Sequence, residues 1–162
     1  MLETPRMVIR EMCPDDIDAI YKIYEGPSIT KYMENLFTDK EEERQYMKDY
    51  YEHVYCFYGY GMWVITLKES EEVIGRAGLE YKEGFDGLEI GFMLGKEHQH
   101  KGYAYEACKA ILEYAKAELE QNEIHAVVHK ENHASIALCE RLGLHKNSHA
   151  KVKEGFCVFS NR

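Results

Sequence analysis

The sequence predicts an α/β protein of the α+β kind, in which helices flank one mixed and mostly antiparallel sheet. Apolar residues alternate between a strand-like period of two and a helical period near 3.6 along the 162 residues. The clearest helical segment lies between two strand-like segments, which is the pattern of a crossover between parallel strands. The composition, 45% apolar and 30% charged, is typical of a globular domain, so we expect residues 1–162 to form a single domain.

The first half of the chain is expected to supply a strand, two helices and three further strands. Residues 7–12 alternate as a strand, and Pro14 then stands where the first turn of a helix tolerates proline. That helix should end at Gly26-Pro27-Ser28, and the acidic run 39–43 should begin a second helix that reaches about Val54. The strands that follow are predicted at residues 63–67, 73–79 and 88–94.

In the second half, small and apolar residues keep helical spacing from Gly102 to about Glu120, which predicts a helix with a narrow, alanine-rich buried face. The remaining elements are a strand at 124–128, a short helix from Ala134 to Leu142 stopped by Gly143, and two weak strands at 145–152 and 156–160. The crossover from Leu88 to Val128 should make the strands at its two ends parallel neighbours.

The charge of the chain is unevenly placed. The net charge is −9, and residues 1–95 hold 10 basic and 20 acidic side chains, whereas residues 96–162 are nearly balanced. We therefore expect no nucleic-acid partner, because binding to phosphate backbones needs clustered Lys and Arg. A cationic small molecule or a basic peptide matches this surface better.

The sequence also carries signals about location. No apolar run approaches the ~20 residues of a membrane span, so we expect no membrane partner. The N-terminal segment lacks a secretory pattern, and the five cysteines form no C-x-x-C pair. These features favour a cytoplasmic protein with reduced thiols and no zinc site.

The most informative segment is the polar stretch from Leu94 to Ala104, between a predicted strand and the start of the longest helix. The first turn of a helix leaves backbone N–H groups free, and its dipole favours an anion. The stretch is therefore either a phosphate site, where Gly102 lets the backbone approach the ligand, or an ordinary connection. The glycine patterns of P-loop and dinucleotide-binding proteins do not occur, which argues against those classes.

Two motifs in this half resemble a known family. Gln99-x-x-Gly102-x-Ala104 is similar to the Q/R-x-x-G-x-G/A motif of the GNAT superfamily of acetyl-CoA-dependent N-acetyltransferases. Asn132-x-x-Ser135, followed by residues 140–144, resembles its second cofactor motif. Segments 6–11, 73–75, 89–91 and 102–107 resemble the branch that contains the ribosomal-protein acetyltransferases RimJ and RimL. The resemblance covers essentially the whole chain and implies the GNAT fold, in which a splayed pair of parallel strands holds acetyl-CoA.

The resemblance also implies which residues hold acetyl-CoA as a co-substrate, without a metal. The pyrophosphate would be bound by the backbone amides of Gln99, His100, Lys101, Gly102, Tyr103 and Ala104. Met93 and Leu94 would bond the pantetheine arm as a neighbouring strand does, and Asn132 and Ser135 would meet its far side. Among the histidines, His125 and His129 lie ~13 Å apart along a predicted strand, which is too far to share a metal ion.

The catalytic groups are less sharply marked. Glu89 is the leading candidate for the general base, because GNAT enzymes often place a glutamate close by, but it lies one residue from the position of the catalytic glutamate of histone-acetylating members. The alternatives are a solvated Glu89 and a base at Glu80. Cys139 occupies the place where many GNAT enzymes have an acid tyrosine, and it is either that acid or a packed helix cysteine. Ser135 or solvent are further alternatives for the acid.

The acceptor side is indicated by aromatic rings and acids between Tyr21 and Trp63. The rings are Tyr24, Tyr32, Tyr46, Tyr50, Tyr51, Tyr55, Phe57, Tyr58 and Tyr60, and the acids are Glu25, Glu34, Asp39, Glu41, Glu42, Glu43, Asp49 and Glu52. Most should belong to the core or to a solvated helix face. We expect the rest to receive a cationic amine, because ring faces and carboxylates both attract cations.

The sequence thus predicts an N-acetyltransferase that moves an acetyl group from acetyl-CoA to a primary amine by direct attack in a ternary complex. The acceptor would be a protein N-terminal α-amine or a polyamine-like small molecule. Two alternatives stay open, an acetyltransferase of amine drugs of the aminoglycoside type and a catalytically silent GNAT-like module that binds coenzyme A. Because members of the family are often dimers, the resemblance also implies a homodimer.

Overall fold

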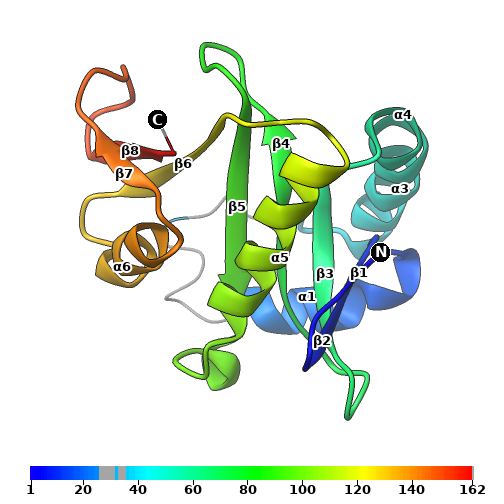
Figure 1. Cartoon of the computed structure of the whole chain (residues 1–162). Helices are drawn as coiled ribbons and strands as arrows, with labels where there is room; N and C mark the ends of the chain where they lie inside the picture. The colour runs from blue at the N-terminus through cyan, green and yellow to red at the C-terminus, as the bar shows by residue number, and fades with distance from the viewer. Residues whose placement is uncertain (26–31, 33–35, 162) are drawn as a thin grey trace.

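The computed structural model describes residues 1–25, 32 and 36–161, and in this part of the chain the strands form one eight-stranded sheet in the order β1-β2-β3-β4-β5-β6-β8-β7 (Figure 1). The strands are β1 Leu2–Glu3, β2 Met7–Arg10, β3 Met62–Leu67, β4 Val73–Tyr81, β5 Leu88–Leu94, β6 Ile124–His129, β7 His145–Asn147 and β8 Phe156–Ser160. Of the pairs recorded among these residues, β5 with β6 is parallel and the others are antiparallel. The mixed, mostly antiparallel sheet is therefore confirmed.

Helices cover both faces of this sheet, with α5 in front of it and α1 behind it in Figure 1. They are the 3₁₀ turn η1 Pro14–Asp16, α1 Ile17–Tyr24, α3 Lys40–Tyr50, the π-helical turn η2 Tyr51–Tyr55, α4 Cys56–Tyr58, the 3₁₀ turn η3 Lys96–His98, α5 Tyr103–Ala117 and α6 His133–Arg141. Asp39 begins α3 by accepting a hydrogen bond from the Glu41 N–H, as an N-cap residue does. The expected helix end at Gly26-Pro27-Ser28 lies outside the described residues.

The largest differences from the expected elements are two boundaries and one additional strand. The helix begun at Asp39 was expected to end near Val54, but it continues through η2 and α4 to Gly59, where a φ of +73° stops it. The strand expected at 145–152 ends at Asn147, because the side chain of Asn147 accepts hydrogen bonds from the N–H groups of His149 and Ala150 and starts a turn. The two-residue strand β1 was not expected.

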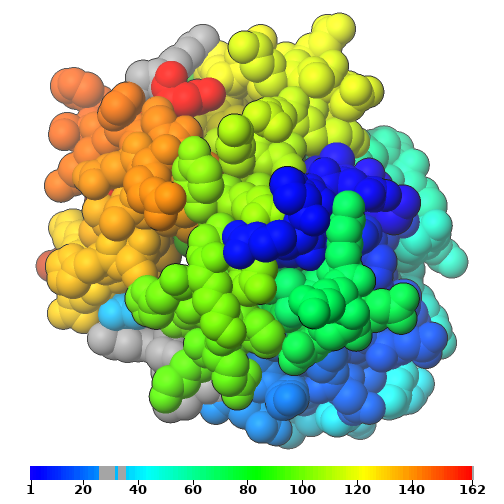
Figure 2. Space-filling view, turned by 60° about the horizontal axis from the view of Figure 1, so that its bottom comes forward, coloured from blue at the N-terminus to red at the C-terminus, as the bar shows by residue number. Residues whose placement is uncertain are grey.

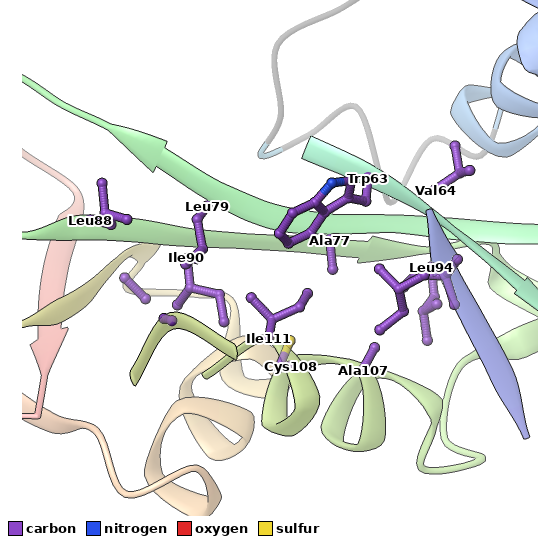
Figure 3. Close-up of a cluster of buried hydrophobic side chains, with 14 of the residues drawn as sticks. Trp63, Val64, Ala77, Leu79, Leu88, Ile90, Leu94, Ala107, Cys108 and Ile111 are labelled. Atoms are coloured by element: carbon purple, nitrogen blue, oxygen red, sulfur yellow. The ribbon is translucent and has the colours of Figure 1, made fainter. Parts of the chain in front are cut away.

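The core between α5 and the sheet is built on small helix residues. Ala107, Cys108 and Ile111 point from α5 toward the sheet, where Leu79 and Ile90 meet them (Figure 3). All five side chains are buried, and each buried Leu or Ile contributes ~1.5–3 kcal/mol. The narrow helix face thus packs closely on β4 and β5 and fixes where the N-terminal end of α5 lies.

The parallel strands separate soon after they meet. Their register contains only Leu88 with Ile124 and Glu89 with His125. Beyond this point β5 stays paired with β4 as far as Leu94, while β6 stays paired with β8 as far as His129. The edge of β5 that faces β6 therefore has no strand partner after Glu89 among the described residues, and a space opens between the two strands.

Candidate functional site

A cleft of about 1290 Å³ opens where β5 and β6 separate. It is lined by β4, β5 and β6, by the N-terminal end of α5, by one side of α6 and by aromatic residues from α1 and α3. The expected acetyl-CoA residues along it are Met93, Leu94, Gln99, His100, Gly102, Tyr103, Ala104, Asn132 and Ser135. Lys101 is exposed and does not line the cleft.

The loop before α5 has the geometry of an anion site. Gly102, the N-cap residue, has φ +83°, and His100 has φ +61°, so the chain turns twice through the left-handed region. The backbone N–H groups from His100 to Tyr105 have no hydrogen-bond acceptor in the part of the chain the structure describes. The amide of Gln99 donates to the Leu94 carbonyl at 3.0 Å and ties the loop to β5. Free N–H groups at a helix N-terminus favour a phosphate.

Arg6, which lies near the N-terminus of the chain, holds this loop in place. Its Nη1 donates to the Lys101 carbonyl at 3.0 Å, its Nε donates to Glu106 Oε2 at 2.7 Å, and its guanidinium lies 4.3 Å from the centre of the Tyr103 ring. Figure 2 shows the N-terminal segment, in blue, lying against the yellow-green segment that contains the start of α5. Burial alone would raise the pKa of Glu106, but hydrogen bonds from Thr4 and Arg6 lower it below its ordinary value, which keeps the pair ionised.

The α6 side of the cleft supplies capping and cationic groups. Asn132 Oδ1 accepts a hydrogen bond from the Ser135 N–H at 3.2 Å and begins α6. The Arg141 guanidinium lies 4.6 Å from the centre of the Tyr105 ring, and both residues line the cleft. Sequence reasoning assigned no role to Arg6 or Arg141, although both stand inside segments that resemble the family.

Glu89 lies at the base of the cleft, where the parallel pairing ends. Its side chain is 21% exposed, and its Oε2 is 3.8 Å from His125 Nε2. Burial raises the pKa of Glu89; Lys82 lowers it and Glu80, its cross-strand partner, raises it. Burial also lowers the pKa of His125, so the imidazole is neutral near pH 7. A carboxylate whose pKa is raised accepts a proton more readily near neutral pH than an exposed one.

Cys139 does not reach the cleft. It is fully buried in the core cluster with Cys108, and burial raises its pKa to about 12. A thiol held away from the reacting groups cannot protonate a leaving thiolate. Cys139 is therefore not the acid, and the other interpretation, a cysteine packed in the core, holds. Ser135 lines the cleft one turn earlier on α6 and keeps its place as a candidate.

Few of the expected acceptor residues reach the cleft. Tyr24, Tyr32, Tyr46 and Glu43 line it, together with Phe37, which was not among the expected residues. Among the others, Tyr50 and Tyr55 are buried and bond the backbone of Met62, whereas Tyr51, Phe57 and Tyr58 are exposed. Glu34 lies outside the described residues.

This arrangement matches a known family of enzymes. A family model described as an acetyltransferase (GNAT) domain matches residues 6–145. The chain belongs to the GNAT family. A curated relative from Bacillus licheniformis, named an uncharacterized N-acetyltransferase p20, is 34% identical over 147 residues, which is 90% of this chain and 82% of that protein.

Solved GNAT structures share the fold. An acetyltransferase from Agrobacterium tumefaciens superposes with a TM-score of 0.81 at 25% identity and covers 99% of this chain and 93% of its own. The ribosomal-protein acetyltransferase RimL, solved in complex with coenzyme A, superposes with a TM-score of 0.77 at 15% identity and covers 97% of this chain and 94% of its own. At 15% identity, the likeness to RimL is a likeness of fold alone.

As a GNAT member, the protein is an N-acetyltransferase, and the GNAT fold uses acetyl-CoA. The cleft fits this co-substrate, because the unpaired β5 edge matches the amides of a pantetheine arm and the free N–H groups match a pyrophosphate. In the described ranges no three or more His, Cys, Asp and Glu side chains are grouped to hold a metal ion. No helix in those ranges is both long and apolar enough to cross a membrane.

Proposed function

We propose that this GNAT enzyme transfers an acetyl group from acetyl-CoA to a primary amine by direct attack in a ternary complex, and that it belongs to the branch of RimJ and RimL. The observation that carries the proposal is the meeting of three features in one cleft: the unpaired edge of β5, the free N–H groups from His100 to Tyr105, and the half-buried carboxylate of Glu89. Likeness to RimL supports the branch through the fold.

The cofactor residues follow from these groups. The N–H groups of the loop from Gln99 to Ala104 would bind the pyrophosphate, with Lys101 contributing through its backbone alone. Met93 and Leu94 would bond the pantetheine arm along the free edge of β5, and Asn132 and Ser135 would close its far side. When bound, acetyl-CoA supplies the acetyl group as an activated thioester.

Glu89 would act as the general base. A lysine-like amine with a pKa near 10.4 is almost entirely protonated at pH 7, so its attack requires a group that takes up the proton. The half-buried Glu89 carboxylate can accept this proton directly or through water. Ser135, on the opposite wall, is the protein group that we propose to protonate the departing thiolate, with solvent as the other source.

The acceptor that the cleft favours carries a positive charge, such as a peptide N-terminus or a small amine. Glu43, Glu80, Glu83 and Glu89 line the cleft together with aromatic rings, and both kinds of group attract cations. All five cysteines are free thiols, which supports a reducing, cytoplasmic setting. Assembly as a homodimer stays a prediction of the family resemblance.

The first test is calorimetric titration of the protein with acetyl-CoA, followed by an acetylation assay on peptides, polyamines and aminoglycosides. We expect micromolar binding, loss of binding in Gly102→Glu, and turnover on peptides or polyamines. Gly143→Glu is the matched control, because Gly143 also has a left-handed φ, +82°, but does not line the cleft. A folded protein that binds no acetyl-CoA would overturn the proposal, binding without turnover would favour the silent module, and turnover confined to aminoglycosides would favour the drug enzyme.

A further inference from the structure

Arg76 lies in the acceptor half of the cleft, in the middle of β4. Its side chain is 8% exposed, and it lines the cleft together with Tyr24 and Met93. In the sheet register it stands between Val64 on β3 and Met93 on β5. Sequence reasoning noted Arg76 only as part of a strand.

The guanidinium of Arg76 is poorly matched by the protein. Nη1 donates to the Tyr24 hydroxyl at 3.4 Å, Nη2 donates to Met12 Sδ at 3.5 Å, and Nε has no hydrogen-bond partner in the described part of the chain. Among residues 1–25, 32 and 36–161, no carboxylate lies within ion-pair distance of it. Arg10 is the useful contrast, because its guanidinium donates to both oxygens of Asp16 at 2.7 and 2.8 Å.

A buried cation without a counter-ion is costly, since the effective desolvation penalty is several kcal/mol for each ion. The long hydrogen bonds to a hydroxyl and a thioether do not offset this desolvation penalty. A carboxylate offsets it when its two oxygens each accept a hydrogen bond from the guanidinium. The arrangement therefore favours a ligand that brings an anionic group to Arg76.

The pyrophosphate is not that group, because it would bind on another side of the sheet. Successive residues of a strand face opposite sides, so Arg76, Gly78 and Glu80 share one face of β4, while Ala77 and Leu79 face α5 (Figure 3). The free N–H groups from His100 to Tyr105 lie in the loop before α5 and in the first turn of that helix. Arg76 instead meets Tyr24 of α1 and Met12, which cover the opposite face.

This face of the sheet has opposite charges at its two ends. Across β4 and β5, Arg76 lies beside Met93, Gly78 beside Gly91, and Glu80 beside Glu89. The middle pair has no side chains. The backbone of Gly61 and Met62 covers Gly78, so a ligand can reach from the cationic to the acidic end only along β5, where Met93, Gly91 and Glu89 line the cleft. Arg76 and Glu80 are four residues apart along β4, which is ~13 Å between their Cα atoms. Both side chains are long enough to reach toward each other.

We infer that the acceptor is an amine that also carries a carboxylate, held by Arg76 while its amine lies near Glu89. This inference rests on the proposed function and narrows it, because a free amino acid or a peptide with an acidic side chain fits, whereas a polyamine lacks the group that Arg76 requires. Arg76 is then a specificity-determining residue of the acceptor site.

The test compares acceptors that differ only in this group. Glutamate is offered against glutamine, 6-aminohexanoate against 6-aminohexanamide, and the dipeptide Ala-Asp against Ala-Asn, and kcat/KM is measured for each with the intact enzyme. For at least one pair we expect the carboxylate to be preferred by about 10- to 100-fold, as a charged hydrogen-bonded pair provides. In Arg76→Met that preference should fall to about one, and Arg76→Lys should keep part of it.

Two controls separate the outcomes. Arg10→Met removes a guanidinium that is paired with Asp16 and does not line the cleft, so it should lower the melting temperature and leave the preference for the carboxylate intact. Acetylation of every amide as fast as its carboxylate, or an equal loss for both in Arg76→Met, would overturn the inference while the proposed function stands. Absence of acetyl-CoA binding, or of turnover on any amine, would overturn the proposed function and the inference with it.

Discussion

Replacing Gly102 with alanine should measure how strongly the loop from Gln99 to Ala104, the proposed pyrophosphate site, depends on a left-handed residue at position 102. Gly102 has φ +83° and ψ 0°, and an L-residue with a side chain pays ~1–2 kcal/mol to adopt a left-handed conformation. The added Cβ would meet only Arg6 Nη2, at 3.4 Å, which is the end of a flexible side chain. The penalty is therefore conformational and not steric.

This penalty must appear in one of two measurements. If the loop keeps its shape, the free energy of unfolding falls by about 1–2 kcal/mol, whereas if the loop relaxes and re-forms on binding, the Kd for acetyl-CoA rises by about 5- to 30-fold. Urea denaturation and calorimetric titration of the same sample measure both quantities. The two losses, expressed as free energies, should add to the conformational penalty.

Gly143→Ala is the matched control. Gly143 has φ +82° with open space around it, so it carries the same strain at the end of α6. We expect it to lose stability and to keep the wild-type Kd. The reasoning fails if Gly102→Ala matches the wild type in both stability and Kd, or if Gly143→Ala weakens acetyl-CoA binding to the same degree.

Three further changes test the neighbouring groups. Arg6→Ala should raise the KM for acetyl-CoA about tenfold and leave the KM for acetylpantetheine, which lacks the pyrophosphate, unchanged; equal effects on both would deny Arg6 its role in the loop. Glu89→Gln should lower kcat/KM by ~10²-fold or more at pH 7, and wild-type activity should fall as the pH drops through a Glu89 pKa above 4.5. Since native Glu89 binds its proton more tightly than the unfolded chain, wild-type stability falls with rising pH through that window, and denaturation should show Glu89→Gln gaining relative stability there. Cys139→Ala should cost about 1 kcal/mol of stability and leave kcat within about twofold, a result that a catalytic thiol would not permit.

The elements that could be predicted are those whose own residues decide them. The bounds of β5 agree with the expectation at both ends, and α5 begins at Tyr103, one residue after the Gly102 that the motif singled out. The end of the helix begun at Asp39 depends on contacts outside the helix. The Tyr55 hydroxyl accepts a hydrogen bond from the N–H of Met12, 43 residues away, and both Tyr50 and Tyr55 bond the backbone of Met62, and this packing carries the helix past Val54. Local propensity carries no information about such contacts.

The site shows the same division. The backbone loop at Gln99–Ala104 could be predicted because a helix N-terminus exposes N–H groups wherever it occurs. Arg6 could not, because its partners Lys101 and Glu106 are about a hundred residues away in the chain. Cys139 was ambiguous because it lies one helical turn from Ser135, and only the packing of α6 on the core decides that the serine faces the cleft while the thiol does not.

The clearest argument for the site is where hydrogen-bonding groups lack partners. Outside the cleft, Asp39 caps α3 and Asp16 neutralises Arg10, whereas the ring nitrogens of His125, beside Glu89, have no hydrogen-bond partner among the described residues. The buried orphan at Thr66 lies where the pairing of β3 with β4 shifts register. Within the cleft, the β5 edge after Glu89, the N–H groups from His100 to Tyr105 and Nε of Arg76 lack partners among the described residues. A fold loses stability at each such group, so their convergence on one cleft indicates that a ligand supplies the missing partners, with amides, phosphates and a carboxylate placed in that order from β5 and α5 to β4.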